Sequence, residues 1–175
     1  ILIAASGCGH TMKAYGEILN GKIDFNVPVL DVHEFLYQKG LSDNFLERLR
    51  PLQSNKSNIN PNQTTEVVFH DACHMIHGQG IIEQARLLLK SIPKLRLLEA
   101  MNSGVCCGSA GIYNLVQPEE ANELGRIKSA ELTDTGAKII ASANIGCSLQ
   151  IRKHINQSFL VKHPMQLLAE SAGFH

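Results

Sequence analysis

The chain has 175 residues, which is enough for one domain with a substantial hydrophobic core but tight for two full-sized domains. Sixteen basic residues balance sixteen acidic ones, so no overall positive field exists to hold nucleic acid or an anionic membrane. Hydrophobic residues make up 44% and charged residues 18%, which excludes a disordered chain. No apolar run approaches the roughly 20 residues that span a bilayer.

Five cysteines are present, an odd number that cannot all pair in disulfides within the chain. We recognise no secretory signal, and therefore expect a cytoplasmic protein in a reducing compartment. There, cysteines more often bind metals or act in catalysis than form disulfides. The sequence opens at Ile1 inside an apolar, strand-like run, and we expect further residues before it.

Strand-like and helix-like segments alternate along the chain. A capping box at Asp31 and Glu34 marks one helix start, and Pro118 marks another. In chain order we expect a strand at 1–5, a helix at about 11–19, a strand at 27–30, helices at 31–40 and 43–50, a strand at 66–70, a helix at 81–92, a strand at 95–99, a helix at 118–136, a strand at 138–143, a helix at 148–155, a strand at 159–162 and a helix at 164–172. This alternation predicts an α/β fold, a mostly parallel sheet flanked by helices.

Residues 51–65 differ in composition, with two prolines, four asparagines and few apolar residues, and they predict a polar linker or loop. Residues 1–8 and 139–147 share a plan of apolar strand, small residues, Gly-Cys and helix. This weak repeat suggests a duplicated unit. We therefore divide the chain into the tail of a first cysteine-rich repeat at 1–50, the linker, and a second repeat at 66–175.

Every cysteine lies just past the predicted end of a strand. Because the carboxyl ends of parallel strands share one edge of a sheet, cysteines far apart in sequence can meet there. Thiolates at such an edge are typical ligands of iron–sulfur clusters or zinc, whereas a single cysteine is more often a small buried hydrophobe. The residues concerned are Cys8, Cys73, Cys106, Cys107 and Cys147.

Histidines surround one of these cysteines. His70, His74 and His77 cluster around Cys73. Zinc could take Cys73 with one or two of them. Alternatively, they donate hydrogen bonds to the sulfur atoms of a cluster or cap the following helix. The sequence leaves these interpretations open.

Four local strings carry a resemblance to a known family. They are HDACHMIHGQG at 70–80, CCGSAGIYNLVQPE at 106–119, NIGCSLQI at 144–151 and HPMQLL at 163–168. Together with the cysteine spacing, they resemble the cysteine-rich CCG domain. That domain occurs in a subunit of heterodisulfide reductase and in the iron–sulfur subunits of lactate utilisation, anaerobic glycerol-3-phosphate dehydrogenase and glycolate oxidase. The strings are most similar to those of the glycolate oxidase protein, and the likeness covers essentially the whole chain.

The resemblance implies a duplicated, Rossmann-like domain whose cysteines bind an iron–sulfur cluster. Its ligands here would be Cys73, Cys106, Cys107 and Cys147, with His74 and His77 near the cofactor. Cys8 would be the tail cysteine of the first copy. The heterodisulfide reductase version ends in Cys-x-x-Cys, but Gln150 stands at the second place here. Four ligands fit an ordinary 4Fe-4S cluster better than the five-cysteine type.

The resemblance also implies partners. The protein would carry electrons from a flavoprotein that oxidises glycolate or another 2-hydroxy acid, with FAD held only by that partner and further subunits in the complex. No residue of this chain is then catalytic, and no nucleic acid or transmembrane segment is involved. Peripheral association with the inner face of the membrane through the complex stays open.

Two other functions remain open from the residues alone. One is a thiol–disulfide oxidoreductase, in which Cys106 or Cys107 reacts and His74 or His77 acts as base. The other is a zinc-stabilised interaction domain.

Overall fold

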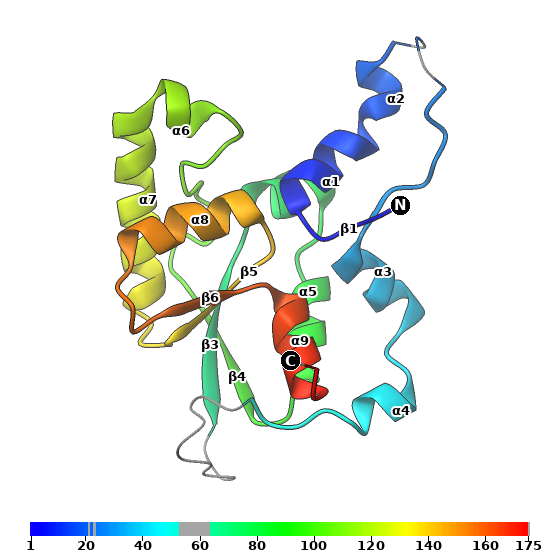
Figure 1. Cartoon of the computed structure of the whole chain (residues 1–175), viewed down its shortest axis with the longest axis vertical. Helices are drawn as coiled ribbons and strands as arrows, with labels where there is room; N and C mark the ends of the chain where they lie inside the picture. The colour runs from blue at the N-terminus through cyan, green and yellow to red at the C-terminus, as the bar shows by residue number, and fades with distance from the viewer. Residues whose placement is uncertain (21, 23, 53–63, 175) are drawn as a thin grey trace.

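The computed structural model describes residues 1–20, 22, 24–52 and 64–174. Four parallel strands form the main sheet in the order β4-β3-β5-β6, and β1 and β2 form a second, two-stranded parallel sheet. Helices flank these sheets (Figure 1). The α/β class predicted from the sequence is therefore confirmed. Within the described part of the chain, no helix combines the length and apolar character needed to cross a membrane.

The elements fall into two groups along the chain. The N-terminal group consists of β1 (Leu2–Ile3), α1 (Ser6–Lys13), α2 (Tyr15–Ile18), β2 (Leu30–Asp31), α3 (Val32–Lys39) and α4 (Asp43–Leu46). The second group consists of β3 (Thr65–His70), the π-helix η1 (His74–Gly78), α5 (Gln84–Lys90), β4 (Leu95–Glu99), α6 (Tyr113–Val116), α7 (Pro118–Thr133), β5 (Ile139–Ser142), α8 (Ile145–His154), β6 (Leu160–Lys162) and α9 (Pro164–Ser171).

The main sheet is buried on both faces. Side chains alternate along β3, so that Val67 and Phe69 enter one core cluster while Val68 enters the other. The first cluster also contains residues of α5 and α9, and the second contains Leu132 of α7 and Ile151 of α8. Figure 1 shows these helix pairs on opposite sides of the strands. The strand edges that carry functional side chains are thus held by packing on both faces.

Local signals in the sequence locate several helix starts. Asp31 accepts a hydrogen bond from the backbone of α3 and Glu34 reaches back to the Asp31 backbone, so the predicted capping box is formed. Pro118 is the first residue of α7, and Glu119 and Glu120 lie in its first turn. His163 makes a second capping box at the start of α9.

Other boundaries differ from the predictions. The first helix begins at Ser6 instead of Thr11, and α8 begins at Ile145 instead of Ser148. The glycines in Gly7–Gly9 and Gly146 hid these starts, because glycine disfavours helix in isolation. The short helices η1 and α6 were not predicted. Of the predicted loop at 51–65, residues 53–63 lie outside the described residues, and β3 already includes Thr65.

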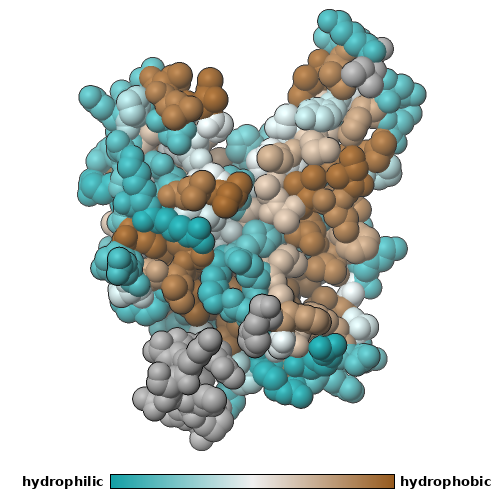
Figure 2. Space-filling model, viewed as in Figure 1, coloured by the Kyte–Doolittle hydropathy of each residue, from teal (hydrophilic) through white to brown (hydrophobic). Residues whose placement is uncertain are grey.

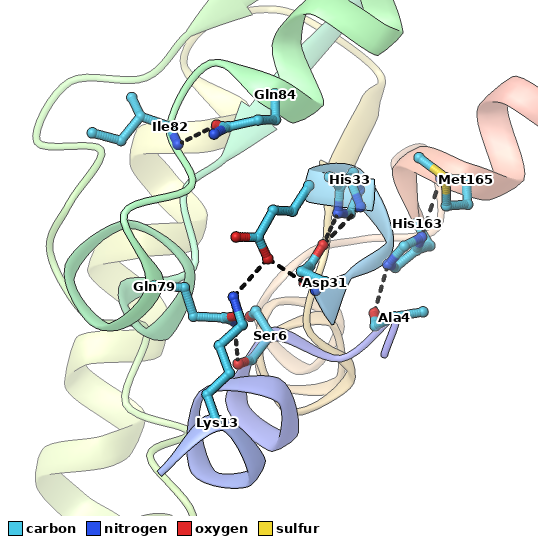
Figure 3. Close-up of polar contacts among 11 residues, drawn as sticks. Ala4, Ser6, Lys13, Asp31, His33, Gln79, Ile82, Gln84, His163 and Met165 are labelled. Atoms are coloured by element: carbon cyan, nitrogen blue, oxygen red, sulfur yellow. Dashed lines mark hydrogen bonds and ion pairs between the residues drawn. The ribbon is translucent and has the colours of Figure 1, made fainter. Parts of the chain in front are cut away.

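Polar contacts attach the N-terminal group to the main sheet unit (Figure 3). His163 Nε2 donates a hydrogen bond to the carbonyl oxygen of Ala4 at 2.8 Å. The side-chain amide of Gln79 donates to the carbonyl oxygen of Ser6 at 2.9 Å. The buried ring of His33 lies 5.3 Å from that of His163, measured between centroids. These contacts hold the start of α1 beside η1 and α9.

A buried ion cluster lies beneath the end of β3. Arg86 of α5 donates to both carboxylate oxygens of Asp71, at 2.9 and 2.6 Å, and also binds Glu99. Its guanidinium carbon lies 4.8 Å from the centre of the Phe69 ring. Arg86 and Asp71 are buried, whereas the Glu99 side chain is about half exposed. The cluster therefore attaches the turn after β3 to helix α5.

We expect Asp71→Asn to lower the free energy of unfolding by about 2–3 kcal/mol, because it leaves a buried guanidinium short of one carboxylate. Urea unfolding followed by circular dichroism measures this change. Glu170→Gln removes the more exposed pair with Lys162 and should cost about 0.5 kcal/mol or less. Equal losses in the two variants would show that burial of the Asp71 pair has no special weight.

Candidate metal centre

Four thiols meet at the carboxyl edge of the main sheet. Cys73 directly precedes η1, Cys106 and Cys107 follow β4 through a turn, and Cys147 is the third residue of α8. The Cys106 side chain interacts with those of Cys73 and Cys107, and the Cys107 side chain interacts with that of Cys147. We call these four residues the thiol cluster. The structure therefore brings together side chains that lie up to 74 positions apart in the sequence.

The thiol cluster is partly sheltered from solvent. Cys107 and Cys147 are 2% and 3% exposed, while Cys73 and Cys106 are half-buried. Cys8 is the third residue of α1 and is exposed, outside this series of thiol contacts. The cluster thus has an inner side within the protein and an outer side toward solvent.

Several N–H groups point at sulfur atoms of the thiol cluster. The backbone N–H of Gly108 donates to Cys106 Sγ at 3.3 Å, and the Asn144 side-chain amide donates to Cys147 Sγ at 3.2 Å. Asn144 also accepts a long hydrogen bond, 3.4 Å, from the backbone of Gly7. The first turn of α8 adds the positive end of its dipole near Cys147. These groups favour negative charge on sulfur.

Two glycines permit close packing around the thiol cluster. A Cβ atom on Gly108 would lie 2.5 Å from the carbonyl oxygen of Ala121 in α7, and Gly108 has a φ of 84°. A Cβ atom on Gly146 would lie 2.6 Å from Ser109 Oγ. Only glycine therefore lets the Cys106-Cys107 loop approach α7 and α8 this closely.

Residues of α7 and η1 anchor the loop before Cys106. Lys128 of α7 is 1% exposed and donates to the carbonyl oxygen of Asn102 at 2.8 Å. Asn102 in turn donates to Glu131 at 3.0 Å. His77 of η1 donates to the carbonyl oxygen of Gly104 at 3.3 Å, so η1 and this loop are joined. The segments carrying Cys73 and Cys106 are thus fixed relative to each other.

The thiols divide into two kinds by pKa. Interaction with the Cys107 and Cys73 side chains lowers the pKa of Cys106, and interaction with Cys107 lowers the pKa of Cys147. The pKa values of Cys73 and Cys107 are raised by their interactions with Cys106 and, for Cys107, with Cys147, and by desolvation. Negative charge is therefore favoured on Cys106 and Cys147 over Cys73 and Cys107.

His70, for which the sequence left zinc binding or hydrogen bonding to sulfur open, also lies at this site. One ring nitrogen of His70 and the Sγ atoms of Cys107 and Cys147 all lie within 4.8 Å of one another. His70 Nδ1 contacts Ser142 Oγ of β5 at 3.2 Å. Burial lowers the pKa of His70 to about 4. As the last residue of β3, the central strand, His70 lies at the edge where the cysteines gather.

The other two predicted histidines make contacts nearby. His74 Nδ1 lies 2.9 Å from Nδ1 of His10 on α1. His77 is exposed and uses Nε2 for the Gly104 carbonyl. A role for either ring at a cofactor stays a prediction.

The donor set fits a soft metal centre. Four thiols in contact, flanked by a buried imidazole and by N–H groups aimed at sulfur, are the groups that bind iron–sulfur clusters or zinc. Metal ions would replace the protons that the thiols now share, since the thiolate is the ligand. Cys73, Cys106, Cys107 and Cys147 are the residues placed to hold such a group.

The fold and the thiol cluster define an α/β protein with a thiol-rich sheet edge, and comparison with known proteins agrees. Residues 67–152 match the family model of the cysteine-rich domain named CCG. This part of the chain is therefore a cysteine-rich domain of the CCG family.

Curated relatives match over nearly the whole chain. The chain is 30% identical to the probable glycolate oxidase iron-sulfur subunit of Bacillus subtilis, over 99% of the chain and 39% of that protein. It is 29% identical to the glycolate oxidase iron-sulfur subunit of Escherichia coli K12, over 98% of the chain and 39% of that protein. It is 30% identical to a fumarate reductase (CoM/CoB) subunit of Methanothermobacter marburgensis, over 91% of the chain and 29% of that protein. The chain thus spans about a third of the length of these relatives.

We expect Gly108→Ala to destabilise the protein and to disperse the thiol cluster. The left-handed backbone costs alanine about 1–2 kcal/mol, and overlap with Ala121 adds about 1–3 kcal/mol. Urea unfolding measures the loss, and the rate of alkylation of Cys107 reports the opening of the loop.

Gly111→Ala is the matched control, because Gly111 also has a positive φ, 62°, but its added Cβ meets nothing within 4 Å. Gly111→Ala should lose only the stability that the left-handed backbone costs, about 1–2 kcal/mol. If both variants lose the same stability and leave Cys107 equally protected, close approach to α7 is not what positions the loop.

Proposed function

We propose that this protein is an iron–sulfur electron-transfer component, and that Cys73, Cys106, Cys107 and Cys147 bind its cluster. The single observation that carries the proposal is the contact among these four thiols at one sheet edge. Two of the relatives are named as iron-sulfur subunits, which supports the proposal. When bound, the cluster would supply one-electron chemistry, and the protein would contribute ligation, hydrogen bonds to sulfur and burial.

A four-iron, four-sulfur cluster suits the ligand number, since each of its irons takes one terminal thiolate. Gln150 stands where a fifth cysteine would fall. Its side-chain amide is 2.7 Å from the carbonyl oxygen of Ala121, to which it donates, and the residue is 6% exposed. This contact gives Gln150 a packing role between α7 and α8 and supports a four-ligand site.

Residues 1–50 form, in this proposal, the tail of a first repeat, and residues 66–175 the second. Two correspondences support it. Cys8 is the third residue of α1, which follows β1, and Cys147 is the third residue of α8, which follows β5. Each of these strands pairs in parallel with the next strand, β2 or β6, which leads into a helix with a capping box. Cys8 would then serve a cluster together with upstream cysteines.

The electron donor in this proposal is a flavoprotein that oxidises glycolate or a related 2-hydroxy acid and holds FAD itself. Two relatives are named as glycolate oxidase subunits, and further subunits would complete the complex. The hydride chemistry would belong to the flavin. A cytoplasmic location, with membrane association only through the complex, agrees with five free cysteines.

An exposed apolar surface beside the thiol cluster suits such a partner. Figure 2 shows hydrophobic side chains over α6 and the start of α8. A groove lined by Ser109, Leu115 and Leu149 links this surface to the cysteine loop. We call it the α6–α8 surface, and its exposed members are Val105, Ile112, Leu115, Val116, Ile145 and Leu149. Large exposed apolar patches commonly mark protein interfaces.

One observation favours a second candidate function, thiol–disulfide exchange. The lowered pKa of Cys106 favours its thiolate, and the neighbouring Cys73 thiol could resolve a mixed disulfide. Iron and sulfide analysis of anaerobically purified protein separates the two functions. A brown protein that bleaches with dithionite supports the cluster, and a colourless protein with one fast-reacting thiol supports exchange.

We expect Cys106→Ser to lose most of its iron and to melt at a lower temperature than wild type. Cluster bonds form only in the folded state, and each ~1 kcal/mol lost lowers the midpoint by roughly 2–4 °C in a chain of this size. Iron analysis and calorimetry after anaerobic reconstitution measure both effects. Cys8→Ser is the control and should keep the iron content of wild type. Retention of full iron by Cys106→Ser would remove this residue from the ligand set.

We expect Leu115→Glu to weaken binding of the flavoprotein partner without changing iron content. Leu115 is 75% exposed, so the charge costs the free protein little but would be desolvated in the interface. Co-purification of the two coexpressed proteins measures the effect. Tyr37→Glu, at a 52% exposed position on α3, should bind the partner normally. Equal binding by both variants would place the interface elsewhere.

A further inference from the structure

His70 occupies a position that four-cysteine ligation does not explain. Its side chain is buried at the end of the central strand, behind Cys107 and Cys147, and one ring nitrogen lies within 4.8 Å of both Sγ atoms. The four thiols already supply the terminal ligands of a four-iron cluster. The imidazole therefore lies close to two sulfur atoms without being needed as a ligand.

The contact with Ser142 sets which ring nitrogen carries the proton. Ser142 is 1% exposed, and among the described residues its hydroxyl contacts His70 Nδ1 at 3.2 Å. A buried hydroxyl proton needs an acceptor, so the hydroxyl donates to Nδ1. A neutral imidazole then carries its single proton on Nε2. The ring becomes an N–H donor, held in orientation by a neighbouring strand.

We propose that His70 is a hydrogen-bond donor to the sulfur atoms of the metal centre, positioned by Ser142, and that it tunes the reduction potential instead of ligating iron. This inference rests on the proposed function. Hydrogen bonds to cluster sulfurs withdraw electron density and stabilise the reduced form. Other N–H groups near the site include those of Gly108 and Asn144, which serve Cys106 and Cys147. His70 adds a donor on the inner side of the thiol cluster, where water does not compete.

The first test compares the reconstituted full chain with His70→Leu, which removes the donor, and His70→Gln, which retains an N–H group. Both variants should bind as much iron as wild type. A dye-mediated redox titration should give His70→Leu a more negative potential, while His70→Gln stays closer to wild type. The control is Tyr37→Leu, which removes an exposed aromatic ring on α3 and should leave the potential unchanged. Loss of iron from both His70 variants, or an unchanged potential in His70→Leu, overturns the proposal.

The second test does not need a cluster. In the metal-free, nitrogen-15-labelled chain, long-range proton–nitrogen correlation spectra report which ring nitrogen of each histidine is protonated. The His70 signals are those absent from the His70→Gln spectrum, and they should show a protonated Nε2 and a bare Nδ1. A protonated Nδ1 overturns the proposal even if iron binds. Failure of wild type to take up iron would instead refute the proposed function, while this spectrum still decides the donor role of His70.

Discussion

The parallel pairing of β3 with β4 and β5 is the constraint on which the rest of this structure depends. Because the three strands run in the same direction and in register, their carboxyl ends lie side by side. The segments that follow them carry Cys73, Cys106, Cys107 and Cys147. Antiparallel pairing at either position would send one group of thiols to the opposite edge. The sulfur contacts are therefore a consequence of strand direction, and the local loops only refine them.

Much of this organisation was predictable because it follows from short-range patterns. Alternation of strand and helix signals specifies parallel strands, and parallel strands place cysteines that follow them at one edge. The capping box at Asp31 and the proline at 118 gave two helix starts directly. Cysteine is also distinctive enough that its position after four strands could be recognised without any knowledge of packing.

The errors arose where tertiary contacts override local preference. Glycines near Cys8 and Cys147 argue against helix by propensity, yet both cysteines lie in the first turn of a helix because Asn144 and the adjacent backbone join the two helix starts. The role of His70 was left open between zinc binding and hydrogen bonding, because its neighbours in space cannot be read from the sequence. Its neighbour Ser142 lies 72 positions away, and the two residues meet because of the register between β3 and β5.

The balance of charge around the thiol cluster also depends on contacts that sequence does not reveal. Lys128 and Arg86 are buried near the end of β3, and each is already paired, Lys128 with Glu131 and Arg86 with Asp71 and Glu99. Their positive charge is therefore largely balanced by these carboxylates. Negative charge favoured on Cys106 and Cys147 is met in the described structure by N–H dipoles and by thiol protons. Dipoles stabilise an anion less than a full positive charge does, and burial raises the cost of leaving that charge unbalanced. Iron ions bound by the four sulfurs would supply the missing positive charge at the point where the protein has prepared a negative one.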